Sequence, residues 1–171
     1  MNIYNNSICV GSIPTGTANF KEISMRQLII ARKDLNMSPG KFAAQVSHAS
    51  WAFLSNQIRN ASNSMEPDCD NILIKLLIPK DVMNEWFCGV FTKTICEAKN
   101  LNQLLKAKIV AEELGLREGV DFFLIWDACL TELTPEKYDD DGTGRTLTCI
   151  GFRPLDDNTA WAISRKFQLY K

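Results

Sequence analysis

Three polar side chains recur at helical spacing in one short stretch of the sequence, NMSPGKFAAQVSHASWAF at 36–53. They are Lys41, Gln45 and His48, the single histidine of the chain, and at about 100° per residue they form one stripe of a helix. An amine, an amide and an imidazole on one face can bind a polar group and move a proton. The solvated face of a helix carries the same residue types, so the spacing alone leaves both interpretations open.

An acidic side chain ends an apolar segment later in the chain. The segment DFFLIWDA at 121–128 runs into Asp127, and Cys129 lies two residues further on, on the same face of an extended chain. In α/β sheets, ligands gather at the carboxyl ends of strands, which makes Asp127 a candidate site residue. The alternative is an aspartate that only begins an Asx-turn.

A strand and a helix must position the first stripe. The apolar run at 28–31, bounded by charged residues, predicts a buried strand over about 26–33. Ser38 is a favourable N-cap, and Pro39 suits the first helical position. The following helix has an apolar stripe that we expect in the core, formed by Phe42, Val46, Ala49 and Phe53. A third side of small residues permits close approach of another element and consists of Ala43, Ser47 and Ser50.

The remaining sequence alternates between strand and helix patterns. Residues 72–78 (ILIKLLI) suit either a strand or a buried helix, and 79–89 predicts a short helix. Further strands are predicted at 91–98, 121–128 and 145–154, and further helices at 100–115 and from 157 onward, before a short extended tail. This order predicts a three-layer α/β/α domain with a mixed sheet over 25–171. Residues 1–24 are polar and are expected to form a flexible extension.

Composition narrows the class of protein. The 171 residues suit one domain, and the formal net charge of −1 argues against a protein that coats nucleic acid with its whole surface. It allows a local basic patch, for which Arg26, Arg32, Lys33 and Lys41 are candidates. No apolar run is long enough to span a membrane, and the first residues lack the features of a secretory signal. We therefore expect a cytoplasmic protein.

Six cysteines occur without a C-x-x-C pair: Cys9, Cys69, Cys88, Cys96, Cys129 and Cys149. With a single histidine they support zinc binding poorly, and neither a metal nor another cofactor is predicted. The default expectation is free, mostly buried thiols in a reducing compartment.

The stretch RQLIIARKDLNMSPGKFAAQVSHAS at 26–50 resembles the N-terminal signature of the second class of peptidyl-tRNA hydrolases, the archaeal and eukaryotic type. That signature is a strand, R-x-D-L-x-M, and then G-K-x-A-A-Q-x-x-H-A. Looser similarity continues in the 85–116 segment, in LIWDACLTEL (124–133), in GRTLTCIG (144–151) and in the ending KFQLYK. The resemblance covers about 25–171.

The resemblance implies a function and a site. The activity would be hydrolysis of the ester between a peptidyl group and the 3′ ribose of tRNA, without a cofactor, on a sheet of about four strands in a domain that is often dimeric. The implied catalytic residues are Lys41, Gln45, Asp127, Thr131 and Thr146, with His48 in support. Asp127 would orient or deprotonate a water, and Lys41 with a threonine would stabilise the oxyanion. The candidate tRNA-binding residues are Arg26, Arg32, Lys33 and Arg145.

Two features depart from the family pattern. Cys129 replaces the glycine that follows Asp-Ala, and it would be strained if that glycine serves a positive φ. The loop at 134–144 is long and acidic, and its charge would repel tRNA phosphate if it leaned over the site. Two alternatives follow: a thiol hydrolase with Cys129 as nucleophile and His48 as base, and a tRNA- or protein-binding protein without turnover.

Overall fold

A computed structural model describes residues 24–61 and 74–171, and it confirms the predicted order of elements. The strands are β1 (Met25–Arg32), β2 (Lys93–Ala98), β3 (Phe122–Asp127), β4 (Lys137–Tyr138), β5 (Gly144–Asp156) and β6 (Gln168–Leu169). The helices are α1 (Pro39–Ala61), η2 (Val82–Val90), α2 (Leu101–Glu113) and α3 (Asp157–Ser164). The predicted extension at 1–24 lies outside the described residues except for Ser24.

The strands form one mixed sheet, as predicted. Its order is β3-β5-β1-β2-β6, with β4 paired to β5 at one end of that strand. Strands β1 and β2 are parallel, whereas β5 runs antiparallel to both β1 and β3. The carboxyl ends of β1, β2 and β3 therefore lie at the same edge of the sheet. The two-residue strands β4 and β6 extend the expected set of about four.

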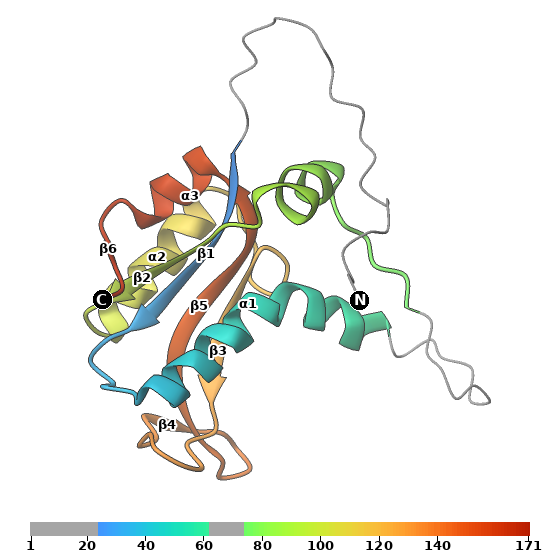
Figure 1. Ribbon diagram of the computed structural model, residues 1–171. Helices are drawn as coiled ribbons and strands as arrows, with labels where there is room; N and C mark the ends of the chain where they lie inside the picture. Colours follow the sequence, from blue (N-terminus) through green and yellow to red (C-terminus); the bar gives the residue numbers. More distant parts are fainter. Residues whose placement is uncertain (1–23, 62–73) are drawn as a thin grey trace, which may run out of the picture.

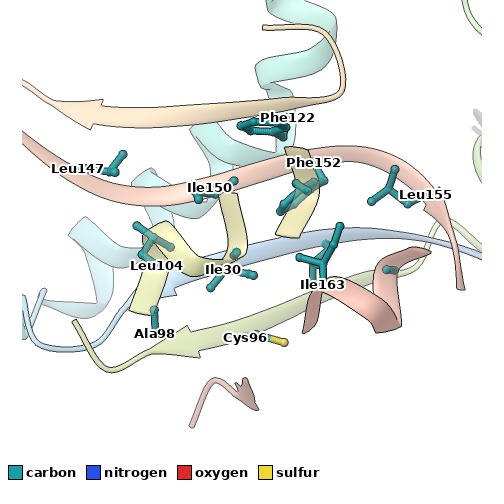
Figure 2. Close-up of a cluster of buried hydrophobic side chains, with 14 residues drawn as sticks. Ile30, Cys96, Ala98, Leu104, Phe122, Leu147, Ile150, Phe152, Leu155 and Ile163 are labelled. Atoms are coloured by element: carbon teal, nitrogen blue, oxygen red, sulfur yellow. The ribbon is translucent and has the colours of Figure 1, made fainter. Parts of the chain in front are cut away.

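Helices cover both faces of the sheet, which confirms the three-layer arrangement (Figure 1). Helices α2 and α3 pack on one face over a core that includes Leu104, Ile150 and Ile163 (Figure 2). Helix α1 lies on the other face, where Ala49 packs with Ile29 and with alternate residues of the neighbouring strands. This alternation is the period of two expected of strands with both faces buried.

Helix α1 approaches β5 more closely than side chains would normally allow. A Cβ atom on Gly151 would lie within 2.3 Å of the Ala49 carbonyl oxygen, so only glycine permits this contact. One polar side chain supports the same contact from inside the core: Gln27, fully buried on β1, donates to the carbonyls of Ser50 and Phe152 and accepts from the Ser50 hydroxyl. Of the predicted small-residue side, Ser50 lies at this contact, whereas Ala43 and Ser47 are exposed, so the prediction is only partly correct.

The apolar segment before η2 forms neither a strand nor a helix in its described part. Residues 74–78 are irregular, and η2 follows with Trp86 buried against Phe53 and Met25. Pro39 begins α1, as expected, and the Ser38 hydroxyl accepts from the Lys41 amide at 3.3 Å. Within the described ranges, no helix combines the length and apolar character that crossing a membrane requires.

The cysteines follow the expectation only in part. Cys96 and Cys149 are buried free thiols, and burial raises the pKa of Cys149 to about 12, while Cys129 is free and half-buried. Cys88 is disulfide-bonded, which corrects the expectation of free thiols at that position. Pairing depends on which residues the fold brings together, and the spacing of cysteines in a sequence does not report it.

We predict that Gly151→Ala destabilises the protein by about 1–3 kcal/mol or more, because the added methyl group would force α1 away from β5. Chemical denaturation followed by circular dichroism measures this loss. Gly40→Ala is the matched control: a Cβ there meets nothing within 4 Å, and the stability should stay unchanged or rise slightly. Equal stability of the two variants would contradict the close contact between Ala49 and Gly151.

Candidate active site

An ion pair joins the start of α1 to the end of β3. The Lys41 ammonium lies 2.6 Å from Asp127 Oδ2 and donates to the Thr131 hydroxyl at 3.3 Å. The side chains of Lys41 and Asp127 are 15% and 9% exposed, so the pair is shielded from water but still reachable at one side. Lys41 and Thr131 are 90 positions apart in the sequence, and with Asp127 they form one polar cluster.

Gln45 completes this cluster from beneath, one helical turn after Lys41. Its side chain is buried, donates from Nε2 to Asp127 Oδ2 at 2.7 Å and accepts from the Thr148 hydroxyl at 2.6 Å. Thr148 also lies 3.0 Å from the Ile125 carbonyl. Because both ends of the amide have partners, Gln45 holds Asp127 in one orientation.

A β-bulge turns Thr148 toward α1. The register between β3 and β5 pairs Ile125 with Cys149 and Trp126 with Leu147, which leaves Thr148 as the extra residue. Leu147 packs in the core under α2, whereas Cys149 faces α1. The bulge therefore reverses the alternation along β5 and brings the Thr148 hydroxyl to Gln45.

The turn after β3 orients the second oxygen of the aspartate. The Cys129 amide donates to Asp127 Oδ1 at 2.8 Å, which is the bond of an Asx-turn. Cys129 adopts φ = 54°, in the left-handed region. Position 129 therefore has the positive φ at which we expected a cysteine to be strained. Asp127 is both the first residue of this turn and a member of the polar cluster.

The loop that follows is tied to the start of α1. Glu132 accepts hydrogen bonds from the amide and the hydroxyl of Ser38, and these bonds lower the pKa of the Glu132 carboxyl. This contact joins the two segments that carry the cluster, because Ser38 lies three residues before Lys41 and Glu132 directly follows Thr131. Composition did not single out either residue, although Ser38 was expected as the helix cap.

Thr146 lies opposite Asp127 on β5, but its side chain makes its hydrogen bonds to the loop before β4. Its fully buried hydroxyl donates to the Thr134 carbonyl at 2.7 Å and accepts from the Glu136 amide at 3.1 Å. Its hydroxyl proton and one of its lone pairs are thus used within the protein. The structure brings Thr146 next to the cluster as a residue that positions the 134–136 segment.

The four candidate tRNA-binding residues occupy different environments. Arg26 begins β1, at the far edge of the sheet from Asp127, and pairs with Asp157. Arg32 is buried, and although burial opposes its charge, hydrogen bonds to Glu136 and Asp34 raise the pKa of its guanidinium. Its donors are thereby occupied within the protein.

Lys33 and Arg145 are partly exposed and lie at the same edge of the sheet as Asp127. Lys33 pairs with Glu97 at the surface. Arg145 pairs with Asp139 from the acidic loop, and Lys137 lies 3.7 Å from the same carboxylate. Asp139 therefore faces cations of its own loop.

His48 does not join the cluster. It is exposed and lines a groove with Trp51 and Trp126, and within the described residues it makes no hydrogen bond. The Cys129 thiol contacts the Asp127 carbonyl at 3.6 Å instead of the imidazole. This arrangement does not supply the Cys129–His48 pair that a thiol hydrolase requires.

In the part of the chain that the structure describes, no three His, Cys, Asp or Glu side chains stand close enough together to hold a metal ion. What the cluster offers is a carboxylate, an ammonium and a hydroxyl around one accessible point. Such a set can activate a water and stabilise an oxyanion.

Sequence reasoning missed Thr148. Regular alternation in GRTLTCIG would place Thr146 and Thr148 on the same face as Ile150, which is in the core under α2. The bulge breaks that alternation, and a single sequence contains no signal that locates it.

We predict that Cys129→Gly leaves the protein as stable as before or up to about 1 kcal/mol more stable, because glycine adopts positive φ without strain. Cys129→Val should destabilise it, since a β-branched residue tolerates this conformation worst. Chemical denaturation of both variants measures the difference. Cys129→Ala separates the thiol from the backbone, and if it matched Cys129→Gly, strain would not be the cause.

Comparison with known proteins agrees with the resemblance seen in the sequence. The family described as "Peptidyl-tRNA hydrolase PTH2" matches residues 25–170. The chain is 28% identical to a peptidyl-tRNA hydrolase of Thermoplasma acidophilum over 144 residues, which cover 84% of this chain and 97% of that protein. It is 35% identical to one of Methanopyrus kandleri over 130 residues, 75% of this chain and 84% of the other.

A third relative, a peptidyl-tRNA hydrolase of Saccharolobus islandicus, is 29% identical over 134 residues, 78% of this chain and 89% of its own length. The family match includes every element that positions the cluster, from β1 and α1 to β3 and β5. The chain belongs to the PTH2 family of peptidyl-tRNA hydrolases.

Proposed function

We propose that this protein hydrolyses the ester between a peptidyl, or N-blocked aminoacyl, group and the 3′ ribose of tRNA. The observation that carries the proposal is the shielded ion pair of Lys41 and Asp127 with Thr131 beside it. It lies at the carboxyl ends of β1 and β3, where α/β proteins bind ligands. Membership of the PTH2 family supports the same substrate.

In the proposed mechanism, Asp127 acts on water. The carboxylate accepts from Gln45 and Lys41 at Oδ2 and from the Cys129 amide at Oδ1, which fixes its plane. A water at the remaining lone pair of Oδ1 attacks the ester carbonyl carbon and gives its proton to the carboxylate. The carbonyl oxygen becomes an oxyanion. When the oxyanion re-forms the carbonyl, the bond to the ribose oxygen breaks, and that oxygen takes up the proton that Asp127 received from the water, which leaves the peptide as a carboxylic acid, the tRNA with a free 3′ ribose hydroxyl and Asp127 ionised again.

Lys41 stabilises the charge that develops. Its ammonium has three donors, of which one faces Asp127 and a second faces Thr131. The third donates to the oxyanion, and the Thr131 hydroxyl, whose own proton is not used by Lys41, donates beside it. Gln45 and Thr146 act as positioning residues, because their polar groups are engaged within the protein.

For tRNA, the proposal uses the accessible cations at the site edge, Lys33 and Arg145. Arg145 and Lys137 partly neutralise Asp139, which reduces the repulsion expected from the acidic loop. Arg26 and Arg32 have no part in this proposal, because one lies at the opposite edge and the other is buried. A cytoplasmic location and a homodimer complete the proposal.

We predict that Asp127→Asn and Lys41→Met each lower kcat by about 10²–10³-fold, the usual effect of removing a group that acts in the transition state. Release of N-acetyl-aminoacyl groups from charged tRNA measures this. The matched control is Lys108→Met, which removes a lysine paired with Glu112 and Glu118 on the opposite side of the sheet and should keep full activity. Thermal melting of each variant separates lost chemistry from lost folding.

Three other outcomes would each exclude the proposed mechanism. A folded wild type that binds tRNA but releases no amino acid would favour a binding protein without turnover. Activity that survives in folded Asp127→Asn would remove the proposed base. Loss of activity in Cys129→Ser, which keeps the side-chain size but replaces the thiol, would support the thiol hydrolase; we expect Cys129→Ser to retain activity.

A further inference from the structure

A groove of about 550 Å³ runs along β3 and ends beside the candidate active site. One wall is a stripe of α1 at helical spacing, with His48, Trp51, Ser55 and Arg59. The other wall is β3 from 123 to 126, and the next residue of that strand is Asp127. The groove therefore borders the polar cluster: Trp126 precedes Asp127 on β3, and His48 follows Gln45 by about one turn of α1.

The β3 wall presents unpaired main-chain groups. Among the described strands, β3 is the edge of the sheet and pairs only with β5 over its length. The Asp121 carbonyl accepts from β5 and the Phe122 carbonyl accepts from Gly119 on the other side, which sets the alternation along the strand. By that alternation, the amide and carbonyl groups of Leu124 and Trp126 point away from β5, toward the free edge.

The free edge is short because its other end is closed. The Gly119 amide covers the Phe122 carbonyl, and the Asn56 side chain on α1 donates to the Gly119 carbonyl at 2.8 Å. Between this closure and Asp127, Leu124 and Trp126 lie about 7 Å apart along the strand. That length accommodates about three residues of an added strand.

The lining favours a peptide over RNA as the occupant. Two large aromatic side chains flank the groove, with Trp51 58% and Trp126 39% exposed. Among the described residues that line it, Arg59 is the one permanent cation, so the groove offers little positive charge to neutralise a run of phosphates. Apolar side chains beside free main-chain donors and acceptors are the features of a site that adds a peptide strand.

Building on the proposed function, we infer that the groove holds the peptidyl chain of the substrate as a short strand parallel to β3. The ester carbonyl must lie at Lys41 and Asp127, so the carboxyl end of the peptide is at the same end as that of β3. The remaining residues then run back along Leu124 toward Asn56. Main-chain hydrogen bonds are independent of side-chain identity, which suits a hydrolase whose substrates differ in peptide sequence.

The first test compares N-acetyl substrates with one, two and three residues, joined to the same tRNA through the same carboxyl-terminal amino acid. We expect kcat/KM to rise about tenfold in total and to level off at about three residues, since each main-chain hydrogen bond contributes about 0.5–1.5 kcal/mol. Cleavage of the one-residue substrate tests the proposed function by itself. If the wild type cleaves all three equally well, the proposed function stands and the groove assignment is wrong.

Substitutions then assign the length dependence to the groove. Ser55→Trp fills the groove and should reduce the ratio of kcat/KM between the three- and one-residue substrates to near one. Ser47→Trp, the same substitution at an exposed position of α1 outside the groove, should preserve the ratio. If Ser55→Trp does not fold, Trp51→Ala provides a second test: it removes part of one wall of the groove and should also lower the ratio of kcat/KM between the three- and one-residue substrates. A Ser55→Trp enzyme that loses both activities by one factor and keeps the ratio would place RNA in the groove and overturn the inference.

A backbone probe distinguishes an added strand from simple apolar contact. In a parallel pair, alternate amides of the peptide face β3. We therefore compare peptides N-methylated at the second or at the third residue from the ester. Methylation at one of these positions should abolish the increase in kcat/KM with peptide length, and methylation at the other should not. Equal effects at both positions would exclude strand addition.

Discussion

The close approach of α1 to β5 is the constraint on which the rest of the structure depends. At Gly151 the helix backbone lies where a side chain would otherwise be, and buried Gln27 ties Ser50 to the same strand. Gln45 lies one turn before Ala49 on this helix, and the approach brings its amide to Thr148 and Asp127. A helix held farther from the sheet would leave those groups without partners. The packing of the core and the geometry of the site therefore share one cause.

The site is a polar network inside an otherwise apolar layer. Gln45, Thr148 and Asp127 are buried, and among the described residues no buried side-chain nitrogen or oxygen lacks a hydrogen-bond partner. Networks of this kind cost folding energy if one member is missing, because the remaining groups are then buried without partners. Lys41 stands at the open side of the network, where its charge is paired but accessible. The same contacts that make the cluster foldable hold its carboxylate in a fixed plane.

The loop after β3 links the site to the edge of the sheet. Cys129 has a left-handed backbone conformation, and its amide donates to Asp127. Three residues later, Glu132 accepts a hydrogen bond from Ser38 at the start of α1. Buried Arg32 pairs with Glu136 and also donates to the Leu147 carbonyl, which fixes the far part of this loop to β1 and β5. Both contacts come before the acidic residues Asp139, Asp140 and Asp141 and anchor the start of that segment. The groove lined by Trp51 and Trp126 lies along β3, before Asp127 in the strand.

The sequence by itself determined the class of fold, the order of the main elements and most of the residues around Asp127. Helical spacing set Lys41 and Gln45 one turn apart, and an apolar strand ended at Asp127, because these are local properties of the chain. Only the tertiary structure decided which of them meet. Helical spacing put His48 in the same stripe as Gln45, yet the sheet beneath α1 covers Gln45 and leaves His48 in the groove. Likewise, the positive charge of Arg32 suggested a surface role, but Asp34 and Glu136 surround it in the fold. Thr148 reaches the site through a bulge that depends on the pairing of two strands, and pairing between distant segments has no signature in either segment alone.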